Sequence, residues 1–406
     1  MAANGIIAQL GGWDGYEVQN GWDEWRGGDR WCVIRLRAVP GIERCCSGCG
    51  RSISAVHDSE ERRVRDLPMF DAAVELLVPR LRLRCDVCGP KLERLNWLAP
   101  YARVTVRLAA SVARLCKVTS VRHVAAFYGL GWPVVKLIDK RALERELGPA
   151  DFSDVRVLGM DEFALHKGHR YATVLVEVQR KRVLWVGRGR GREDVRPFFE
   201  LLGAERCKQV QAVVMDMNTG YELEVRQHCP QADVVFDLFH VLAKYGREVI
   251  DRVRVDEANR LRHDRPARRL VKSARWLLLR NRDNVAAEDQ VRLDELLEAN
   301  RALFTVYVLK DDLKALCDYR HAGYAQRFWQ HWYRRAVRSR IAPLVAFARK
   351  LKPYLPGILA HCRWPLGTNL IEGINNKIKV IKRMAYGFRD EAYFFLKIRA
   401  AFPGIR

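Results

Sequence analysis

The sequence predicts an α/β protein in which a mixed β-sheet core carries a large all-α insertion and follows two small N-terminal domains. Three observations support this fold class. Residues 154–237 alternate strand-like and helix-like segments in the order β-β-β-α-β-α-β. Residues 243–361 are helical in pattern and strongly basic. The first 150 residues contain two Cys-x-x-Cys pairs and then a pattern of three helices.

The composition indicates a globular protein that binds a polyanion. Of 406 residues, 49% are hydrophobic and 29% are charged, which excludes a disordered or collagen-like chain. No apolar run approaches bilayer length, and the first 28 residues lack the features of a signal peptide, so we expect a soluble, intracellular protein with no membrane partner. The net charge of +23 makes nucleic acid the expected partner.

The charge is unevenly distributed, because a near-neutral block over residues 151–240 lies between basic flanks. This pattern is expected if the block concentrates carboxylates for a metal while the flanks bind phosphate. A basic, solvated surface without a ligand is the alternative.

Residues 1–30 are rich in Gly and Trp, mildly acidic and without helical or strand periodicity. We expect a poorly ordered leader there and infer no function for it.

Residues 31–95 have the pattern of a zinc ribbon. The eleven cysteines are an odd number scattered along the chain, which argues against a disulfide framework. Two Cys-x-x-Cys pairs, each followed by Gly, could direct four thiolates to one tetrahedral structural Zn²⁺. The expected ligands are Cys46, Cys49, Cys85 and Cys88. The pairs lie farther apart than is usual, so redox motifs and chance remain alternatives, and Cys45 could replace Cys46.

Residues 96–150 contain apolar residues at helical spacing in three pieces, 104–115, 120–127 and 133–147. A short helix, a glycine turn and a helix with Pro in its first turn indicate a helix-turn-helix. A purely structural three-helix linker is the alternative.

Residues 151–242 are expected to form the first part of a ribonuclease H-like core. In this fold order a mixed sheet presents acidic residues from strand ends to metal. The expected strands are 155–161, 170–178, 182–187, 210–216 and 232–237, with helices at 192–202 and 219–228.

Residues 243–361 are the expected all-α insertion. Its basic residues include Arg268, Arg269 and Lys272, which we expect to contact DNA phosphates.

Residues 362–406 are expected to return to the core as a C-terminal helix. Glu372, Asn376, Lys379 and Arg383 share one helical face, whereas Ile371, Ile374, Ile378 and Ile381 share another. A single carboxylate at the head of a basic stripe suggests a metal ligand beside bound phosphate. The alternative is that Glu372 only complements the helix N-terminus.

Four motifs together resemble the bacterial insertion-sequence transposases of the ISL-three group, over about residues 40–400. The last motif is long and specific, whereas each aspartate motif is weak by itself. The motifs are Gly159-Met-Asp161-Glu-Phe, Val214-Met-Asp216-Met, Asp237-Leu-Phe-His240-Val, and Glu372-Gly-Ile-Asn-Asn-Lys-Ile-Lys with Lys382-Arg383 and Tyr386-Gly-Phe-Arg389.

The resemblance implies a metal-dependent DDE transposase that cleaves DNA and transfers the cut strand. It implies a catalytic triad of Asp161, Asp216 and Glu372 that binds two Mg²⁺ or Mn²⁺ ions, with Asp237 and His240 as supporting residues. Asn376, Lys379, Lys382 and Arg383 would contact DNA. The expected partners are terminal inverted repeats and target DNA in the bacterial nucleoid, bound by a homodimer or higher oligomer.

Two other functions remain compatible with the sequence. A non-catalytic DNA-binding regulator could keep the ribbon and the helix-turn-helix, although three intact acids argue against it. A ribonuclease H-like nuclease or resolvase would release cut ends without joining them to new DNA.

Overall fold

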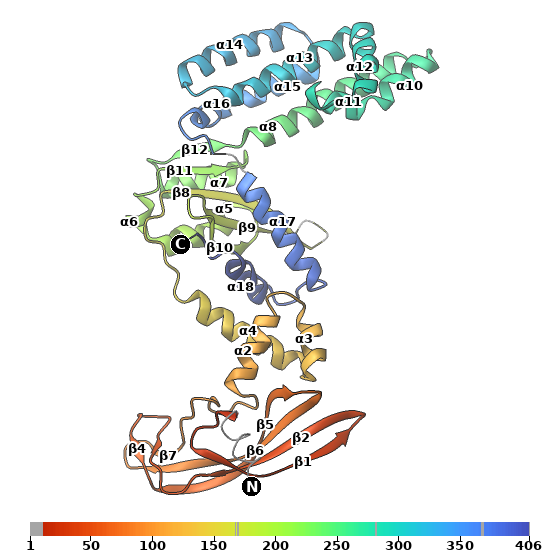
Figure 1. The fold of residues 1–406 in the computed structure, drawn as a ribbon. Helices are drawn as coiled ribbons and strands as arrows, with labels where there is room; N and C mark the ends of the chain where they lie inside the picture. Colours follow the sequence, from red (N-terminus) through yellow and green to blue (C-terminus); the bar gives the residue numbers. More distant parts are fainter. Residues whose placement is uncertain (1–10, 167, 169, 281, 367–368, 406) are drawn as a thin grey trace. The chain divides into compact units, whose positions relative to one another are not determined.

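The computed structural model describes residues 11–166, 168, 170–280, 282–366 and 369–405 (Figure 1). The chain forms two compact units: residues up to Gly148 together with Ile381–Leu396, and Pro149–Val380 together with residues from Lys397 onward. Within the described residues, no helix is long and apolar enough to cross a membrane.

The first unit begins with a five-stranded sheet in the order β1-β2-β6-β5, with β7 beside β6. The β1–β2, β5–β6 and β6–β7 pairs are antiparallel, and β2–β6 is parallel. The strands are β1 (Tyr16–Arg26), β2 (Asp29–Ala38), β5 (Val56–Met69), β6 (Ala72–Cys85) and β7 (Gly89–Leu92), and a separate two-stranded ribbon pairs β3 (Arg44–Cys45) with β4 (Ser52–Ile53).

The expectation of a poorly ordered leader over residues 1–30 is wrong for its described part, because β1 and the start of β2 lie there. Only Tyr16 of β1 is buried, so this strand carries almost no apolar periodicity. Its acidic residues pair across the strands instead, Glu17 with Arg37 (2.7 Å) and Asp23 with Arg30 (2.6 Å). Residues 1–10 lie outside the described residues.

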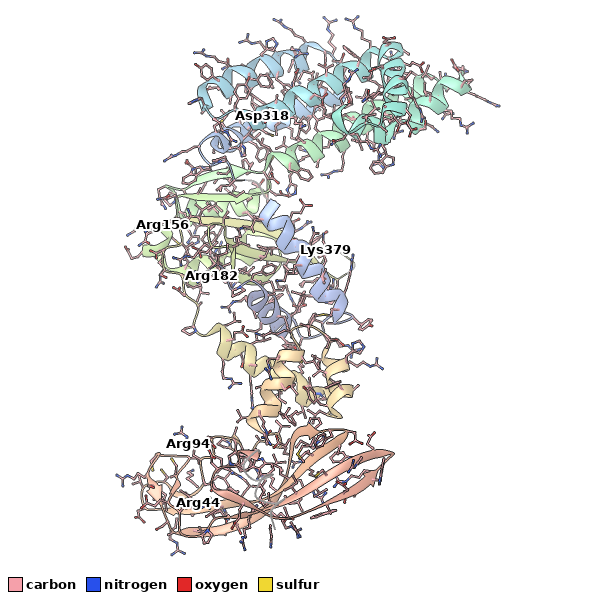
Figure 2. The ribbon with its side chains drawn as sticks, in the orientation of Figure 1. Arg44, Arg94, Arg156, Arg182, Asp318 and Lys379 are labelled. Atoms are coloured by element: carbon pink, nitrogen blue, oxygen red, sulfur yellow. The ribbon has the colours of Figure 1, made fainter. Side chains whose placement is uncertain are left out.

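A buried ion pair joins the β3–β4 ribbon to the end of the large sheet. Arg44, labelled in Figure 2, donates to Glu93 Oε2 over 2.7 Å, and both side chains are almost fully buried. Tyr16 also donates to Glu93. Arg80, also buried, lies 3.8 Å from Glu93, so two guanidinium groups and one hydroxyl surround this carboxylate and partly offset the cost of its desolvation.

Three helices follow the sheet in the first unit: α2 (Val106–Leu115), α3 (Val121–Tyr128) and α4 (Trp132–Leu147). Thr105 and Ser120 cap α2 and α3 by accepting bonds from backbone amides. Gly129 ends α3 with a φ of 58°, a left-handed conformation that glycine adopts without strain, and permits the turn into α4. These helices agree closely with the segments expected from sequence.

The second unit contains a five-stranded mixed sheet in the order β10-β9-β8-β11-β12. β8, β9 and β10 are antiparallel neighbours, whereas β11 runs parallel to both β8 and β12. The elements are β8 (Val157–His166), β9 (Arg170–Glu177), β10 (Arg182–Arg188), α5 (Arg192–Leu202), α6 (Ala204–Cys207), β11 (Ala212–Met215), α7 (Thr219–His228) and β12 (Asp233–Phe236).

Helices fill the chain after β12, and among the described residues from 238 to 366 there is no strand. One hydrophobic core runs from the sheet into these helices and includes Phe236, Tyr245 and Trp332. The elements are α8 (Leu238–Tyr245), the π-helix η1 (Gly246–Ile250), α9 (Asp251–Arg260), α10 (Arg265–Ser273), α11 (Arg275–Leu279), α12 (Ala287–Ala299), α13 (Arg301–Ala315), α14 (Ala322–Arg338), α15 (Ala342–Leu351) and α16 (Leu355–Leu359), with 3₁₀ turns η2 (Arg282–Asn284), η3 (Leu316–Asp318), η4 (Lys352–Tyr354) and η5 (Ala360–Cys362).

Two helices complete the chain, α17 (Asn369–Met384) and α18 (Glu391–Ala401). Figure 1 shows α17 beside β8, and Ile371 of α17 lies against Gly159 of that strand. We expected residues 362–406 to belong entirely to the core, but residues 381–396 cluster with the first unit.

Candidate active site and cysteine cluster

Asp161 lies within β8, which is hydrogen-bonded between β9 and β11. Its Oδ1 accepts a bond from the amide of Glu162 (2.8 Å), and its Oδ2 accepts one from Asn375 Nδ2 (2.5 Å). Burial raises the pKa of Asp161 to about 6, and the charges of Glu162 and Asp237 act in the same direction. A cation bound here would therefore relieve an unfavourable buried charge.

Asp216 and Asp237 directly follow two neighbouring parallel strands, β11 and β12. Because the carboxyl ends of parallel strands meet at one edge of a sheet, their side chains lie close together. Asp237 also caps α8 by accepting a bond from the amide of Phe239 (3.0 Å), which places His240 in the first turn of that helix. Ligand atoms of Asp216, Asp237 and His240 all lie within 4.8 Å of one another.

His240 connects the two aspartates. Its Nδ1 contacts Asp216 Oδ1 and lies 3.9 Å from Asp237 Oδ2. Burial lowers the pKa of His240, although the negative charge of Glu372 opposes this shift. Burial thus favours the neutral imidazole, which can donate or accept a hydrogen bond.

Glu372 is exposed in the first turn of α17, and its neighbours on both sides contact β8. Ile371 packs so closely on Gly159 that a Cβ at residue 159 would lie 2.6 Å from Ile371 Cδ1. Asn375 bonds Asp161. The first turns of α17 are therefore fixed against β8, with Glu372 near enough to His240 to act on its pKa. Asp161 directly follows Met160, which pairs with Met215 just before Asp216, so the two aspartates occupy adjacent positions on β8 and at the end of β11, and Glu372 lies on the helix that packs on β8.

A pocket of about 580 Å³ is lined by Asp216 and His240, but not by Asp161 or Glu372. Its lining combines the carboxylates of Glu162 and Asp216 with the cations of Lys244 and Arg247. Glu162 is also paired with Arg190 over 2.9 Å. A phosphodiester bound to a metal ion places negative phosphate oxygens beside a positive ion. The cations of the lining can attract the phosphate, and its carboxylates can attract the metal ion.

Four polar residues of this region were not predicted from sequence: Glu162, Lys244, Arg247 and Asn375. Two signals could have found three of them. Residues 240, 244 and 247 recur at helical spacing, so Lys244 and Arg247 share a face with His240. Asn375 follows Ile371 by four residues, and a polar residue on the buried face of a helix requires a partner.

The residues expected to contact DNA lie on two helices. Lys379, labelled in Figure 2, hydrogen-bonds Asn376 Oδ1 over 3.2 Å on an exposed face of α17, and Lys382 and Arg383 lie in the last turns of that helix. On α10, Arg269 and Lys272 are exposed, and neither forms an ion pair with another described residue, whereas Arg268 is half-buried.

The four cysteines of the two Cys-x-x-Cys pairs form a separate cluster in the first unit. The thiols of Cys46, Cys49, Cys85 and Cys88 all lie within 4.8 Å of one another. Backbone amides of Cys49 and Gly48 lower the pKa of the Cys46 thiol to about 7, which favours the thiolate that binds metal. Cys45 lies outside the cluster, and its Sγ contacts the carbonyl of Gly50 at 3.4 Å.

Three family models match the chain in succession. The zinc-finger of transposase IS204/IS1001/IS1096/IS1165 matches residues 43–88, the helix-turn-helix domain of transposase family ISL3 matches residues 93–143, and a model described as transposase, of the same ISL3 group, matches residues 158–398.

Two curated relatives are similar over most of the chain. The transposase for insertion sequence element IS1001 of Bordetella parapertussis is 56% identical over 401 residues, which cover 98% of both chains. The transposase for insertion sequence element IS1557 of Mycobacterium tuberculosis is 28% identical over 381 residues, which cover 88% of this chain and 85% of the relative.

Proposed function

Because the chain belongs to transposase family ISL3, we propose that its second unit is a ribonuclease H-like core whose triad is Asp161, Asp216 and Glu372. The chain is a DNA-binding enzyme that cleaves DNA and transfers the cut strand. The main support for this triad is that two contacts fix α17 on β8. Ile371 packs on Gly159, and Asn375 donates a hydrogen bond to Asp161. Glu372 lies between them.

The residues present fit two Mg²⁺ or Mn²⁺ ions. Carboxylate oxygens are the hard ligands that these ions prefer, and Asp161, Asp216 and Glu372 would supply them. Asn375 Oδ1 is buried and has no hydrogen-bond partner among the described residues, as expected of an oxygen beside a cation. When bound, the ions activate the attacking oxygen and offset the charge that develops on the phosphate.

The chain's own residues position the reactants. Asn375 orients Asp161, and Asp237 orients α8 so that His240 contacts Asp216. Lys244 and Arg247 attract the phosphodiester into the pocket. Water first attacks the phosphodiester at a transposon end and frees a 3′-hydroxyl, and this hydroxyl then attacks target DNA. No covalent bond to the protein is required.

The cysteine cluster fits one structural Zn²⁺, held by Cys46, Cys49, Cys85 and Cys88. Four thiolates arranged as a tetrahedron are typical of structural zinc sites. A bound ion would stabilise the fold of the ribbon. This site supports the fold of the first unit rather than the chemistry.

The zinc ribbon and the helix-turn-helix recognise terminal inverted repeats, while basic residues of α10 and α17 bind phosphates. Affinity for DNA should fall steeply with salt, because phosphate contacts release counterions. Two transposon ends must be brought together, so the active form on the bacterial nucleoid is a homodimer or a higher oligomer.

A strand-transfer assay with Mg²⁺ and DNA carrying the element's ends tests this function. Asp216→Asn should bind the ends but neither cleave nor join them. Asp154→Asn is the matched control, because Asp154 is an exposed aspartate just before β8. Normal strand transfer by Asp216→Asn would refute the triad. Cleavage without joining by the parent protein would indicate a nuclease, and binding without cleavage a regulator.

A further inference from the structure

A pocket of about 760 Å³ lies within the first unit, away from the cysteine cluster. Three chain segments line it: the start of α3, the start of α4 and the loop between α17 and α18. Pockets of roughly 300–1,000 Å³ are typical of small-molecule sites. This one is therefore large enough for a nucleotide.

The loop that closes this pocket is fixed at its C-terminal end. Asp390 pairs with Lys136 of α4 over 2.7 Å and caps α18 by accepting a bond from the amide of Tyr393 (3.0 Å). The Tyr393 hydroxyl donates to Asp139, which is buried in α4. Phe388 stacks on Phe394 with ring centroids 4.5 Å apart. The pocket is thus a built feature of the helix-turn-helix unit.

Two aromatic rings and two guanidinium groups of the lining remain available to a ligand. Trp132 is 60% exposed and Tyr386 is 83% exposed, and the Tyr386 ring meets the His123 ring edge to face with centroids 6.5 Å apart. Lys136 is neutralised by Asp390, whereas Arg122 and Arg389 form no ion pair with another described residue. Exposed rings beside free cations match a nucleotide, because its base stacks and its phosphate is negatively charged.

We propose that this pocket binds one unpaired nucleotide of the bound DNA, a proposal that rests on the function proposed above. The base leaves the duplex stack and packs on Trp132 or Tyr386, and its phosphate is bound by Arg122 and Arg389. The start of α4 has no side-chain cap, so its positive end adds to the attraction for phosphate. A base inside an intact duplex presents no open face to these rings, so stacking requires it to unpair.

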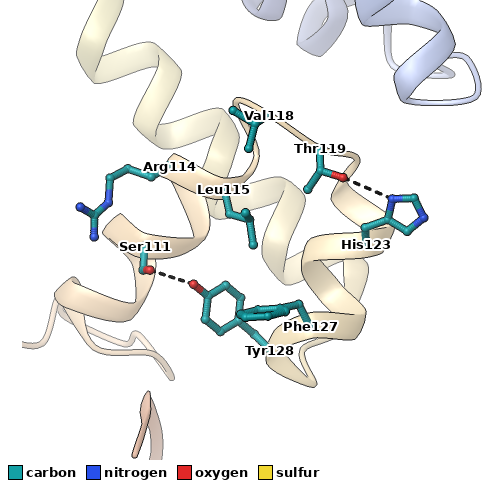
Figure 3. Close-up of a pocket in the computed structure, with 8 residues that line it drawn as sticks. All are labelled: Ser111, Arg114, Leu115, Val118, Thr119, His123, Phe127 and Tyr128. Atoms are coloured by element: carbon teal, nitrogen blue, oxygen red, sulfur yellow. Dashed lines mark hydrogen bonds between the residues drawn. The ribbon is translucent and has the colours of Figure 1, made fainter.

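A second pocket, of about 500 Å³, borders the other side of α3 and does not fit this ligand (Figure 3). Arg114 is its only arginine or lysine among the residues that line it. Its polar groups bond one another, Ser111 with Tyr128 over 2.8 Å and Thr119 with His123 over 3.3 Å (Figure 3). Of these two pockets, only the one closed by the loop combines two exposed rings with two arginines that form no ion pair with another described residue.

Mismatch scanning with the full-length protein tests the proposal. Terminal-repeat duplexes carry a mismatch at one position at a time, and affinity is measured for each. Flipping a paired base costs a few kcal/mol, so a mismatch at the flipped position should strengthen binding about fivefold or more. This gain should disappear in at least one of Trp132→Ala and Tyr386→Ala, the variant that lacks the ring on which the base stacks, but persist in Tyr386→Phe, which keeps the ring.

Phe70→Ala is the matched control, because Phe70 is also a fully exposed aromatic residue at positive φ in the first unit. It should keep the gain. The proposal is wrong if no position shows a gain although the parent protein binds and transfers its ends, or if both alanine variants retain it. A parent protein that neither binds nor cleaves these ends would instead refute the proposed function, and with it this pocket's role.

Discussion

Asn375 donates a hydrogen bond to Asp161 over 2.5 Å and so joins α17 to the central strand of the mixed sheet. The contact links the helix that carries Glu372 to the most buried of the three proposed catalytic acids. It also distinguishes the two asparagines of the Glu372 motif: Asn375 faces the sheet, whereas Asn376 faces solvent.

Asn375→Ala should slow DNA cleavage by about 10–100-fold, the usual cost of removing a group that orients a metal ligand. Asn375→Asp should add a negative charge beside Asp161, raise its pKa and shift the pH profile of cleavage to higher pH. Single-turnover cleavage rates at a series of pH values measure both effects. Asn376→Ala should change DNA affinity but not this pH profile. Identical profiles for Asn375→Asp and the parent would contradict the assignment.

Asp161→Asn should stabilise the metal-free protein at pH 8 while abolishing cleavage. The folded-state pKa of Asp161 is about 6, above its ordinary value of 3.8, so the folded protein binds more protons than the unfolded chain between these values. The destabilisation by this carboxylate is therefore full above pH 6 and disappears as pH falls toward 3.8.

Urea unfolding of both proteins with and without Mg²⁺ measures the difference. The variant should be more stable at pH 8 by roughly 3 kcal/mol, and the two should converge near pH 4. Mg²⁺ should stabilise the parent more than the variant. A variant that is less stable at every pH would show that burial does not govern this carboxylate.

Gly159→Ala should displace α17 and slow cleavage, because the new Cβ would lie 2.6 Å from Ile371 Cδ1 and 3.2 Å from Val178. Overpacking of this kind costs about 1–3 kcal/mol. Ile371→Val removes the clashing methyl group, so the double variant should recover part of both stability and activity. Thermal unfolding and cleavage rates of the two single variants and the double variant give the coupling. If the effects of the two substitutions simply add in the double variant, residues 159 and 371 are not in contact and α17 does not pack on β8 at this point.

Cys49→Ser should lose bound zinc and destabilise the first unit, since one of four ligands would be missing. Cys45→Ser should keep one zinc per chain, because Cys45 lies outside the cluster although it is adjacent to Cys46. Zinc content by elemental analysis and the unfolding temperature of each purified variant distinguish them. Loss of zinc from Cys45→Ser would show that Cys45, rather than Cys46, is a zinc ligand in the first Cys-x-x-Cys pair.

Elements with an apolar period were predicted well from sequence. Helices α2 to α4 have a strong helical period and caps, and the strands of the mixed sheet are nearly continuous apolar runs because both of their faces are covered. The grouping of Asp161, Asp216 and Glu372 was predicted only from the resemblance of their motifs to a known family. Residues so far apart in the sequence give no local sign that they lie near one another.

The large N-terminal sheet was missed for a physical reason. In β1 and in the first half of β5 most residues are exposed, and cross-strand ion pairs such as Arg82 with Asp58 support the pairing. Such strands carry no alternating apolar pattern. Membership of residues 381–396 in the first unit was equally hidden, because it depends on long-range contacts such as Lys136 with Asp390.

The rate of DNA cleavage by Glu372→Gln tests the central claim most directly. Glutamine keeps the size and polarity of the side chain but cannot supply a negatively charged metal ligand. The rate of cleavage in Mg²⁺ should fall by more than a hundredfold, whereas DNA affinity should be unchanged. This loss exceeds the roughly 10–100-fold effect of removing a residue that only hydrogen-bonds a metal ligand. Glu205→Gln, at an exposed position of α6, should cleave normally. Cleavage by Glu372→Gln at the parent rate would contradict the three-acid site.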